Sequence, residues 1–135
     1  MALGFAYLRH DGLQTAFHEA ASFVARCNEV VQLAVLDGFD VVYIAREDAR
    51  RPVRLVSELG MRLPAHACAL GKALLANLDA DALAACVPAE LPRVTDRTLA
   101  TREALYQELD LVRQMGLGQD LEEVATGLVL SLIHI

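Results

Sequence analysis

The fold class is decided by one stretch of the chain, Val30-Val31-Gln32-Leu33-Ala34-Val35-Leu36-Asp37-Gly38-Phe39-Asp40-Val41-Val42-Tyr43-Ile44-Ala45. Its Asp37-Gly38 pair separates two runs of aliphatic and β-branched residues, and both members of such a pair tolerate the positive φ of a tight turn. We therefore predict a β-hairpin with strands over Val30–Leu36 and Val41–Ala45. The first strand is apolar on both faces. We expect helices of this chain to cover one face and a second subunit to cover the other.

Helical and extended patterns flank this hairpin. Before it, apolar residues at helical spacing predict a helix from Leu13 to Cys27. After it, the sequence predicts a third strand over Arg51–Glu58, helices over His66–Leu78 and Ala80–Cys86, a polar connection over Pro88–Thr98, a helix capped by Thr101 and stopped by Gly116, an irregular acidic segment over Asp120–Thr126 and a last strand over Leu128–Ile135. This order predicts an α+β fold built on an antiparallel sheet.

Composition narrows the class of protein. The chain has 135 residues, of which 55% are hydrophobic, enough apolar surface for one folded domain rather than a disordered chain. No uncharged stretch reaches the roughly 20 residues that cross a bilayer, and the N-terminal residues lack a secretory pattern. The formal charge of −6 argues against direct binding of nucleic acid. We expect a cytoplasmic protein with no membrane partner.

No residue pattern in the chain predicts catalysis. The three cysteines, Cys27, Cys68 and Cys86, are widely spaced, which supports neither a disulfide framework nor a zinc site. His66 and Cys68 lie two residues apart at a helix start, so their side chains face different directions, and no third group joins them. Gly71-Lys72 lacks the other residues of a phosphate-binding loop. The sequence therefore predicts no enzyme, no catalytic residue, no metal and no cofactor.

Two segments have both a structural and a functional interpretation. Gly60 to Ala76 passes from glycine and proline into a helix of small residues, which leaves the first helical amides uncovered. Such amides suit a carboxylate or phosphate, although small residues also allow close helix–sheet packing. Asp120, Glu122 and Glu123 form either a solvated acidic loop or carboxylates that line a pocket. Both alternatives stay open for each segment at this stage.

Four motifs resemble the IclR family of bacterial transcriptional regulators, in the family's order and spacing. They are the signature Gly-x-x-Leu-Pro-x-His-Ala-x-x-x-Gly-Lys-Ala-Leu-Leu-Ala from Gly60 to Ala76, the hairpin from Leu33 to Arg46, the Thr95 and Thr98-Leu99 connection, and Arg113-x-x-Gly116 followed by Asp120-x-Glu122-Glu123-x-x-x-Gly127. The resemblance covers about Leu3 to Leu128. It lies wholly within the C-terminal, effector-binding part of that family.

The resemblance implies a fold, a ligand class and a set of site residues. The fold is a GAF-like α+β domain with a curved antiparallel sheet and flanking helices, assembled into dimers or tetramers. The pocket takes a small organic or aromatic carboxylate, which controls transcription through changes of oligomer. The ligand carboxylate meets the backbone amides of Ala69 and Leu70, and Asp120, Leu63 and Leu128 line the same pocket.

The ends of the chain depart from the family pattern. We expect residues 1–128 to form the effector-binding domain, incomplete at its C-terminus, and we interpret residues 129–135 as an atypical tail that is not native to the domain. No winged helix-turn-helix precedes Leu3, so DNA would be bound only through such a domain supplied elsewhere. The alternative functions are a stand-alone oligomerisation or interaction module and a nonfunctional fragment.

Overall fold

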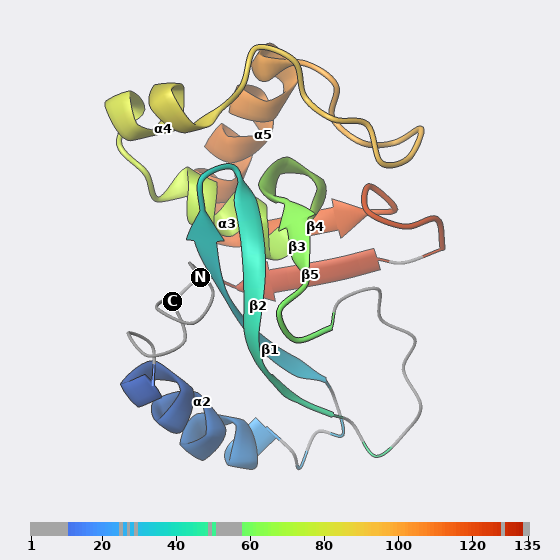
Figure 1. Cartoon of the computed structure of the whole chain (residues 1–135). Coiled ribbons are helices and arrows are strands. Elements are labelled where there is room, and N and C mark those ends of the chain that lie inside the picture. Colours follow the sequence, from blue (N-terminus) through green and yellow to red (C-terminus); the bar gives the residue numbers. More distant parts are fainter. Residues whose placement is uncertain are drawn as a thin grey trace. The chain divides into compact units, whose positions relative to one another are not determined.

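The structure is a computed structural model that describes residues 11–24, 26, 28, 30–48, 50, 58–127 and 129–133. The chain divides into two compact units, one of Met1–Val35 with Val42–Met61 and the other of Leu36–Val41 with Arg62–Ile135. The elements in chain order are α2 (Asp11–Val24), β1 (Val31–Asp37), β2 (Asp40–Glu47), β3 (Arg62–Pro64), the 3₁₀ helix η2 (Ala65–Ala67), α3 (Ala69–Ala76), α4 (Ala80–Cys86), α5 (Arg102–Met115), β4 (Leu117–Leu121) and β5 (Val129–Ile133) (Figure 1).

The predicted hairpin is confirmed. Strands β1 and β2 are joined at Gly38, whose φ of 62° is the left-handed value that favours glycine. Strand β3 adds to β2, and the resulting sheet has the order β1-β2-β3. Phe39 O accepts from Ala65 N at 2.9 Å, and Met61 O accepts from Tyr43 N at 3.2 Å, which is the pattern of an antiparallel pair. The expected α+β fold with antiparallel strands is therefore present.

The third strand predicted from the sequence stays a prediction. Most of the segment predicted for it, Arg51–Glu58, lies outside the described residues. The strand that completes the sheet is β3, and it is only three residues long. Pro64 ends it and leads into η2, so β3 serves as the entry to α3.

The helices match their sequence signals closely. Helix α4 begins after Asp79, whose side chain accepts from Ala82 N, and α5 begins after Thr101, whose hydroxyl accepts from Ala104 N. Gly116 ends α5 with a φ of 66°. The predicted helix over His66–Leu78 is divided instead, because Cys68 is extended between η2 and α3.

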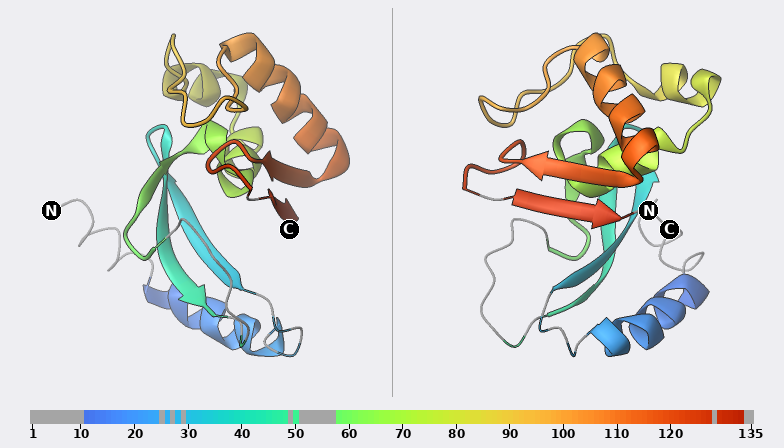
Figure 2. Two further views of the ribbon diagram at one scale, coloured as in Figure 1. Left: turned by 90° about the vertical axis from the view of Figure 1, so that its right-hand side faces the viewer. Right: turned by 180° about the vertical axis from the view of Figure 1, so that it is seen from behind.

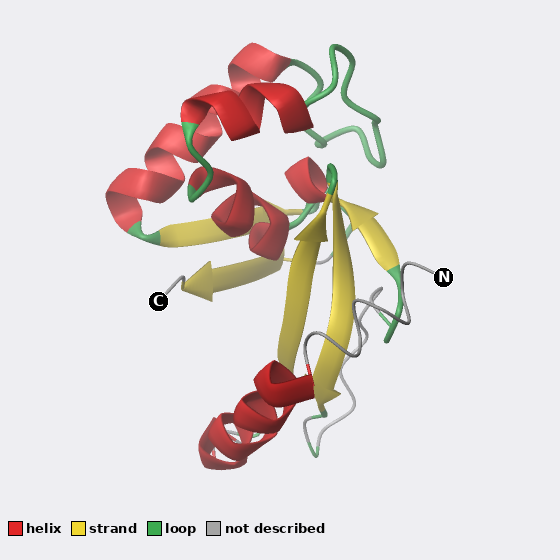
Figure 3. Cartoon of the chain, turned by 60° about the vertical axis from the view of Figure 1, so that its left-hand side comes forward, coloured by secondary structure: helices red, strands yellow, loops and turns green. Residues whose placement is uncertain are grey.

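Strands β4 and β5 form a second, two-stranded antiparallel sheet (Figure 2). Asp120 pairs with Leu130 in this register, so the segment predicted as irregular from Asp120 begins as a strand. The prediction of a final strand after residue 127 is confirmed by β5. Helix α3 contacts both of these strands and also α5, as the colouring by secondary structure in Figure 3 helps to follow. Helix α3 is therefore the central element of its unit.

Two glycines allow this close packing around α3. A Cβ at Gly71 would overlap the backbone of Ala65, and a Cβ at Gly118 would overlap the carbonyl oxygen of Ala69. The packing interpretation of the Gly60–Ala76 segment is thus correct at Gly71. It leaves the anion-site interpretation open, because these approaches involve the backbone of Ala65 and the carbonyl oxygen of Ala69 rather than an acceptor for the first amides of α3.

We expect Gly71→Ala to lower the free energy of unfolding by about 1–3 kcal/mol, because the new methyl group meets backbone rather than a movable side chain. Urea denaturation followed by circular dichroism measures the change. Gly12→Ala is the matched control, since nothing lies within 4 Å of a Cβ there and the helical position gains from alanine. Equal midpoints for Gly71→Ala and the wild type would contradict the close approach of Ala65.

Candidate functional site

The first turn of α3 has amides without helical partners. Cys68, with φ −129° and ψ 150°, is the N-cap residue, and its side chain makes no capping hydrogen bond. The first bond of the helix runs from Lys72 N to Cys68 O at 3.0 Å. The amides of Ala69, Leu70 and Gly71 therefore have no acceptor within the helix, and they carry the partial positive charge of its N-terminus. This turn can bind an anion.

Strand β4 presents one face to this turn. The position where a Gly118 side chain would lie is occupied by Ala69 O, so that face of β4 looks onto the start of α3. Side chains two residues apart share a face of a strand, and Asp120 lies two residues after Gly118. Both residues are buried, whereas their neighbours Gln119 and Leu121 are more exposed. The Asp120 carboxyl therefore points to the same side as the α3 N-terminus.

A buried ammonium group joins α3 to the surrounding elements. Lys72 is fully buried, and its Nζ donates to Glu123 Oε1 at 2.7 Å, to Gln119 O at 2.8 Å and to Glu108 Oε1 at 3.2 Å. Glu123 lies in the turn that follows β4 and contains Glu122 and Glu123, which we call the acidic turn. Gln119 belongs to β4 and Glu108 to α5. A buried charge is tolerated only when it is paired and hydrogen-bonded, which these contacts achieve. Lys72 thus fixes the acidic turn beside the first turns of α3.

Two threonine side chains hold the acidic turn from its other side. Thr98 Oγ1 donates to Glu123 O at 2.5 Å, and Thr95 Oγ1 donates to Glu122 O at 2.7 Å. Thr98 Oγ1 also accepts from the amides of Val94 and Thr95. Glu122 has a positive φ of 63°, a backbone conformation that needs such support in a residue other than glycine.

Two buried carboxyl groups of this cluster each keep one oxygen without a hydrogen bond. Asp120 Oδ1 accepts from Glu123 N at 2.8 Å, while Asp120 Oδ2 and Glu123 Oε2 are buried and unpaired among the described residues. Burial raises the pKa of Asp120, against the opposing effect of its backbone hydrogen bonds and of Lys72. Burial likewise raises the pKa of Glu123, against its ion pair with Lys72. The alternative of a solvated acidic loop is wrong for these two residues.

His66 lies buried at the entry to α3. Its Nε2 is 2.7 Å from Pro92 O, which makes Nε2 the donor and leaves Nδ1 as an unpaired acceptor. Its ring stacks on Phe39 with 5.1 Å between the ring centroids. Burial lowers the pKa of His66, so the ring is neutral. These contacts give His66 a packing role and separate it from Cys68, whose Sγ faces Pro64 O.

The structure brings together three of the five residues predicted for the ligand site. Ala69 and Leu70 form the first turn of α3, and Asp120 faces that turn from β4. Leu63 is buried on β3, two residues before η2, and its part in a pocket stays a prediction. Leu128 lies outside the described residues. The sequence analysis gave Lys72 no role in the site, because it treated this residue only as part of an excluded phosphate-binding loop and of the family signature. The signal available in the sequence was the position of Lys72, one helical turn after Cys68.

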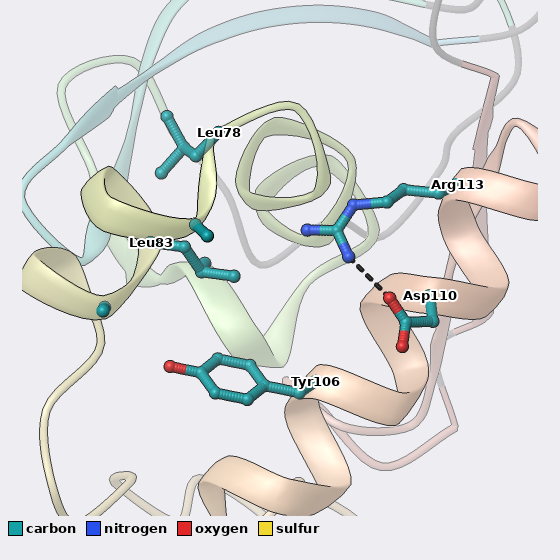
Figure 4. Close-up of a pocket in the computed structure, with 7 residues that line it drawn as sticks. Leu78, Leu83, Tyr106, Asp110 and Arg113 are labelled. Carbon is teal, nitrogen blue, oxygen red and sulfur yellow. Dashed lines mark hydrogen bonds and ion pairs between the residues drawn. The ribbon is translucent and has the colours of Figure 1, made fainter.

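Two pockets lined by described residues lie away from this site. One, of about 530 Å³, is lined by Leu78, Ala80, Leu83, Ala84, Tyr106, Asp110 and Arg113 (Figure 4). Arg113 is already engaged there by Ala76 O at 2.8 Å and by Asp110 at 2.7 Å, so this pocket is a poor site for a carboxylate. The other, also of about 530 Å³, lies in the first unit and is lined by Ser22, Arg26, Asn28 and Arg50. Its two guanidinium groups make it the rival anion site.

Within the described parts of the chain, no three His, Cys, Asp or Glu side chains are placed to hold a metal ion together. Over the same residues, no helix has the length and apolar character that crossing a membrane requires.

We expect Lys72→Met to destabilise the chain by about 3–5 kcal/mol at pH 7, because Glu123 would keep a buried charge with no partner. Urea denaturation checks this value. Arg62→Met is the matched control: Arg62 pairs with Asp37 and Asp40 at the exposed end of the hairpin, where the loss should stay below about 1 kcal/mol. Lys72→Met/Glu123→Gln should recover part of the loss, and no recovery would contradict the pairing.

We expect the free energy of unfolding of Asp120→Asn, relative to that of the wild type, to increase as the pH rises. A carboxyl whose pKa is raised by folding holds a proton that the unfolded chain releases above about pH 4, so its contribution to stability falls with rising pH until the folded pKa is passed. The neutral amide has no such loss. Urea midpoints of both chains between pH 5 and 8 give the difference, in which the opposite effect of His66 cancels. A pH-independent difference would contradict this expectation.

Comparison with known proteins places the chain in a family. Residues 5–130 match the family described as bacterial transcriptional regulator IclR C-terminal. The HTH-type transcriptional regulator KdgR of Dickeya chrysanthemi is 36% identical over 119 residues, which are 87% of this chain and 39% of KdgR. The chain thus spans well under half the length of this curated relative. Because the relatives are transcriptional regulators, the prediction of a non-enzymatic regulatory domain is confirmed.

Solved structures agree with this assignment. The crystal structure of IclR from Thermotoga maritima has a TM-score of 0.81 and 29% identity, and the match covers 93% of this chain and 51% of that one. A double mutant of the PobR inducer-binding domain from Acinetobacter, in complex with 3-hydroxybenzoic acid, has a TM-score of 0.68 and 32% identity, with coverages of 79% and 64%. From these matches and its sequence, the chain belongs to the IclR family of bacterial transcriptional regulators and corresponds to their C-terminal, effector-binding part.

Proposed function

We propose that this chain senses a small organic or aromatic carboxylate, which binds at the start of α3. The observation that carries the proposal is the uncapped first turn of α3 beside a buried, incompletely bonded Asp120. The amides of Ala69 and Leu70 would receive the carboxylate oxygens. Leu63 and Leu128 would contact the apolar part of the ligand. This is the arrangement that helix N-termini use for anions in general.

The class of ligand is supported by a relative. A double mutant of the PobR inducer-binding domain, at 32% identity to this chain, forms a complex with 3-hydroxybenzoic acid. An aromatic ring with one carboxylate suits a site that combines the amides of a helix start with the buried apolar side chain of Leu63. We therefore take 3-hydroxybenzoate as the probe ligand for this chain, and leave the physiological acid to a wider screen of carboxylates.

The sensing role implies a larger regulator. We propose that residues 1–128 form the effector-binding domain, and that DNA is bound through a winged helix-turn-helix. The regulator would act in the cytoplasm as a dimer or tetramer. Ligand binding would shift the populations of its oligomeric states, which requires different affinities for the ligand in those states. A stand-alone oligomerisation module is the second candidate, favoured by the apolar, half-exposed β1.

We expect Ala69→Pro to weaken 3-hydroxybenzoate binding by about tenfold to a hundredfold, because it removes one amide donor to a charged group. Proline suits this position: it is the first of the helix, and Cys68 before it is already extended. Ala80→Pro, at the first position of α4 after the extended Asp79, is the matched control and should bind as the wild type does. Isothermal titration measures both affinities.

The ligand and the rival pocket provide two further tests of this proposal. The neutral analogue 3-hydroxybenzamide should not bind, since it lacks the charge that the helix terminus attracts. The double variant Arg26→Gln/Arg50→Gln should keep its affinity for 3-hydroxybenzoate. Binding lost there but kept in Ala69→Pro would place the ligand in the first unit. A stable oligomer with no thermal shift from any carboxylate would favour the oligomerisation module.

A further inference from the structure

The charges around Lys72 do not balance. One ammonium group is surrounded by the carboxyls of Glu123 at 2.7 Å and Glu108 at 3.2 Å, and the fully buried Asp120 lies on the same side of β4. Glu108 is partly exposed, so water stabilises its charge. Two buried carboxyls then depend on one cation, and an uncompensated buried charge is costly. We therefore expect one of these two carboxyls, Asp120 or Glu123, to be protonated.

Hydrogen bonds indicate which carboxyl holds that proton. Glu123 Oε1 accepts directly from Lys72 Nζ at 2.7 Å, and this contact favours the ionised form of Glu123. The amides of Glu123 and Val124 both lower the pKa of Asp120, but burial outweighs them, and Asp120 Oδ2 is buried and has no partner among the described residues. An unpaired buried oxygen is an acceptor left unsatisfied if Asp120 is ionised. If Asp120 is protonated at Oδ2, the same atom can donate a hydrogen bond to a ligand.

We propose that Asp120 meets the effector as a neutral carboxylic acid and donates its Oδ2 proton to the effector carboxylate, so that binding is coupled to one proton. This inference rests on the proposed function, because it concerns the same site. It adds the protonation state that recognition requires. An ionised Asp120 beside the α3 N-terminus would repel a carboxylate, whereas a neutral one adds a hydrogen bond to the amides of Ala69 and Leu70.

The other ionisable groups of the cluster agree with this assignment. Burial raises the pKa of Asp120 above its usual value, which keeps the acid neutral over a wider pH range. His66, the titratable group that η2 contributes, has a lowered pKa and adds no second cation. The charged groups that act on Asp120 are thus Lys72 of α3 and Glu123 of the acidic turn, and Glu108 of α5 joins this cluster through Lys72.

The test is isothermal titration of the 135-residue chain with 3-hydroxybenzoate between pH 5.5 and 8.5. Repeating each titration in buffers of different ionisation enthalpy gives the number of protons taken up. We expect the affinity of the wild type to be flat at low pH and to fall by up to tenfold per pH unit above the pKa of Asp120, with uptake approaching one proton. Asp120→Asn, whose amide can donate from the same place, should bind with no pH dependence and no uptake.

A matched control and a second measurement make the outcomes distinct. Asp110→Asn changes an exposed carboxylate and should keep the pH dependence of the wild type. A pH dependence that survives in Asp120→Asn overturns the inference, and so does a wild-type affinity that is independent of pH in a chain whose free Asp120 carboxyl loses its proton below pH 8.5. A pH-independent affinity in a chain whose free Asp120 stays protonated up to pH 8.5 supports the neutral acid. If neither chain binds at any pH, the proposed function fails instead. A ¹³C titration of the Asp120 carboxyl in the free chain then decides the protonation state alone: a pKa near 4 overturns it.

Discussion

The pairing of Lys72 with the acidic turn is the interaction on which the second unit depends. One buried ammonium group takes acceptors from α5, β4 and the turn after β4, so three elements that are distant in sequence meet at one atom of α3. Dispersion and apolar burial could hold the same elements together, but without a fixed register. A directional, charged contact selects one arrangement. The same arrangement places Asp120 on the face of β4 that looks onto the start of α3, so the proposed ligand site shares its contacts with those that stabilise the unit.

Local signals made much of this fold predictable. Asp37-Gly38 between apolar runs, Asp79 and Thr101 before helical patterns, and Gly116 after one act through neighbouring residues, and each was placed correctly. The break at Cys68 was not predicted, because Ala65 to Ala67 and α3 share one apolar pattern. The break depends instead on Pro64 and on the close approach of Ala65 to Gly71, a contact between turns that the pattern does not reveal.

The candidate site was predictable in its residues but not in its chemistry. The small residues after Pro64 indicated free amides at a helix start, and the resemblance to a known family pointed to those of Ala69 and Leu70 and to Asp120. Neither could show that Asp120 and Glu123 are buried with one oxygen each unpaired, since burial depends on packing against α3. Nor could spacing reveal the partners of Lys72, which lie 36 to 51 residues away along the chain. Long-range contacts of this kind exist only once the chain has folded.

The sequence contains a single lysine, and the folded chain buries it completely. All other side-chain cations are arginines, which resist acylation. Reagents and enzymes that modify lysine amines therefore find their target only when α3 separates from the acidic turn. Acylation of Lys72 would cancel the charge that holds this turn, so the modified chain could not close again in the same way. Acylation at Lys72 thus reports opening of the second unit and also makes that opening permanent.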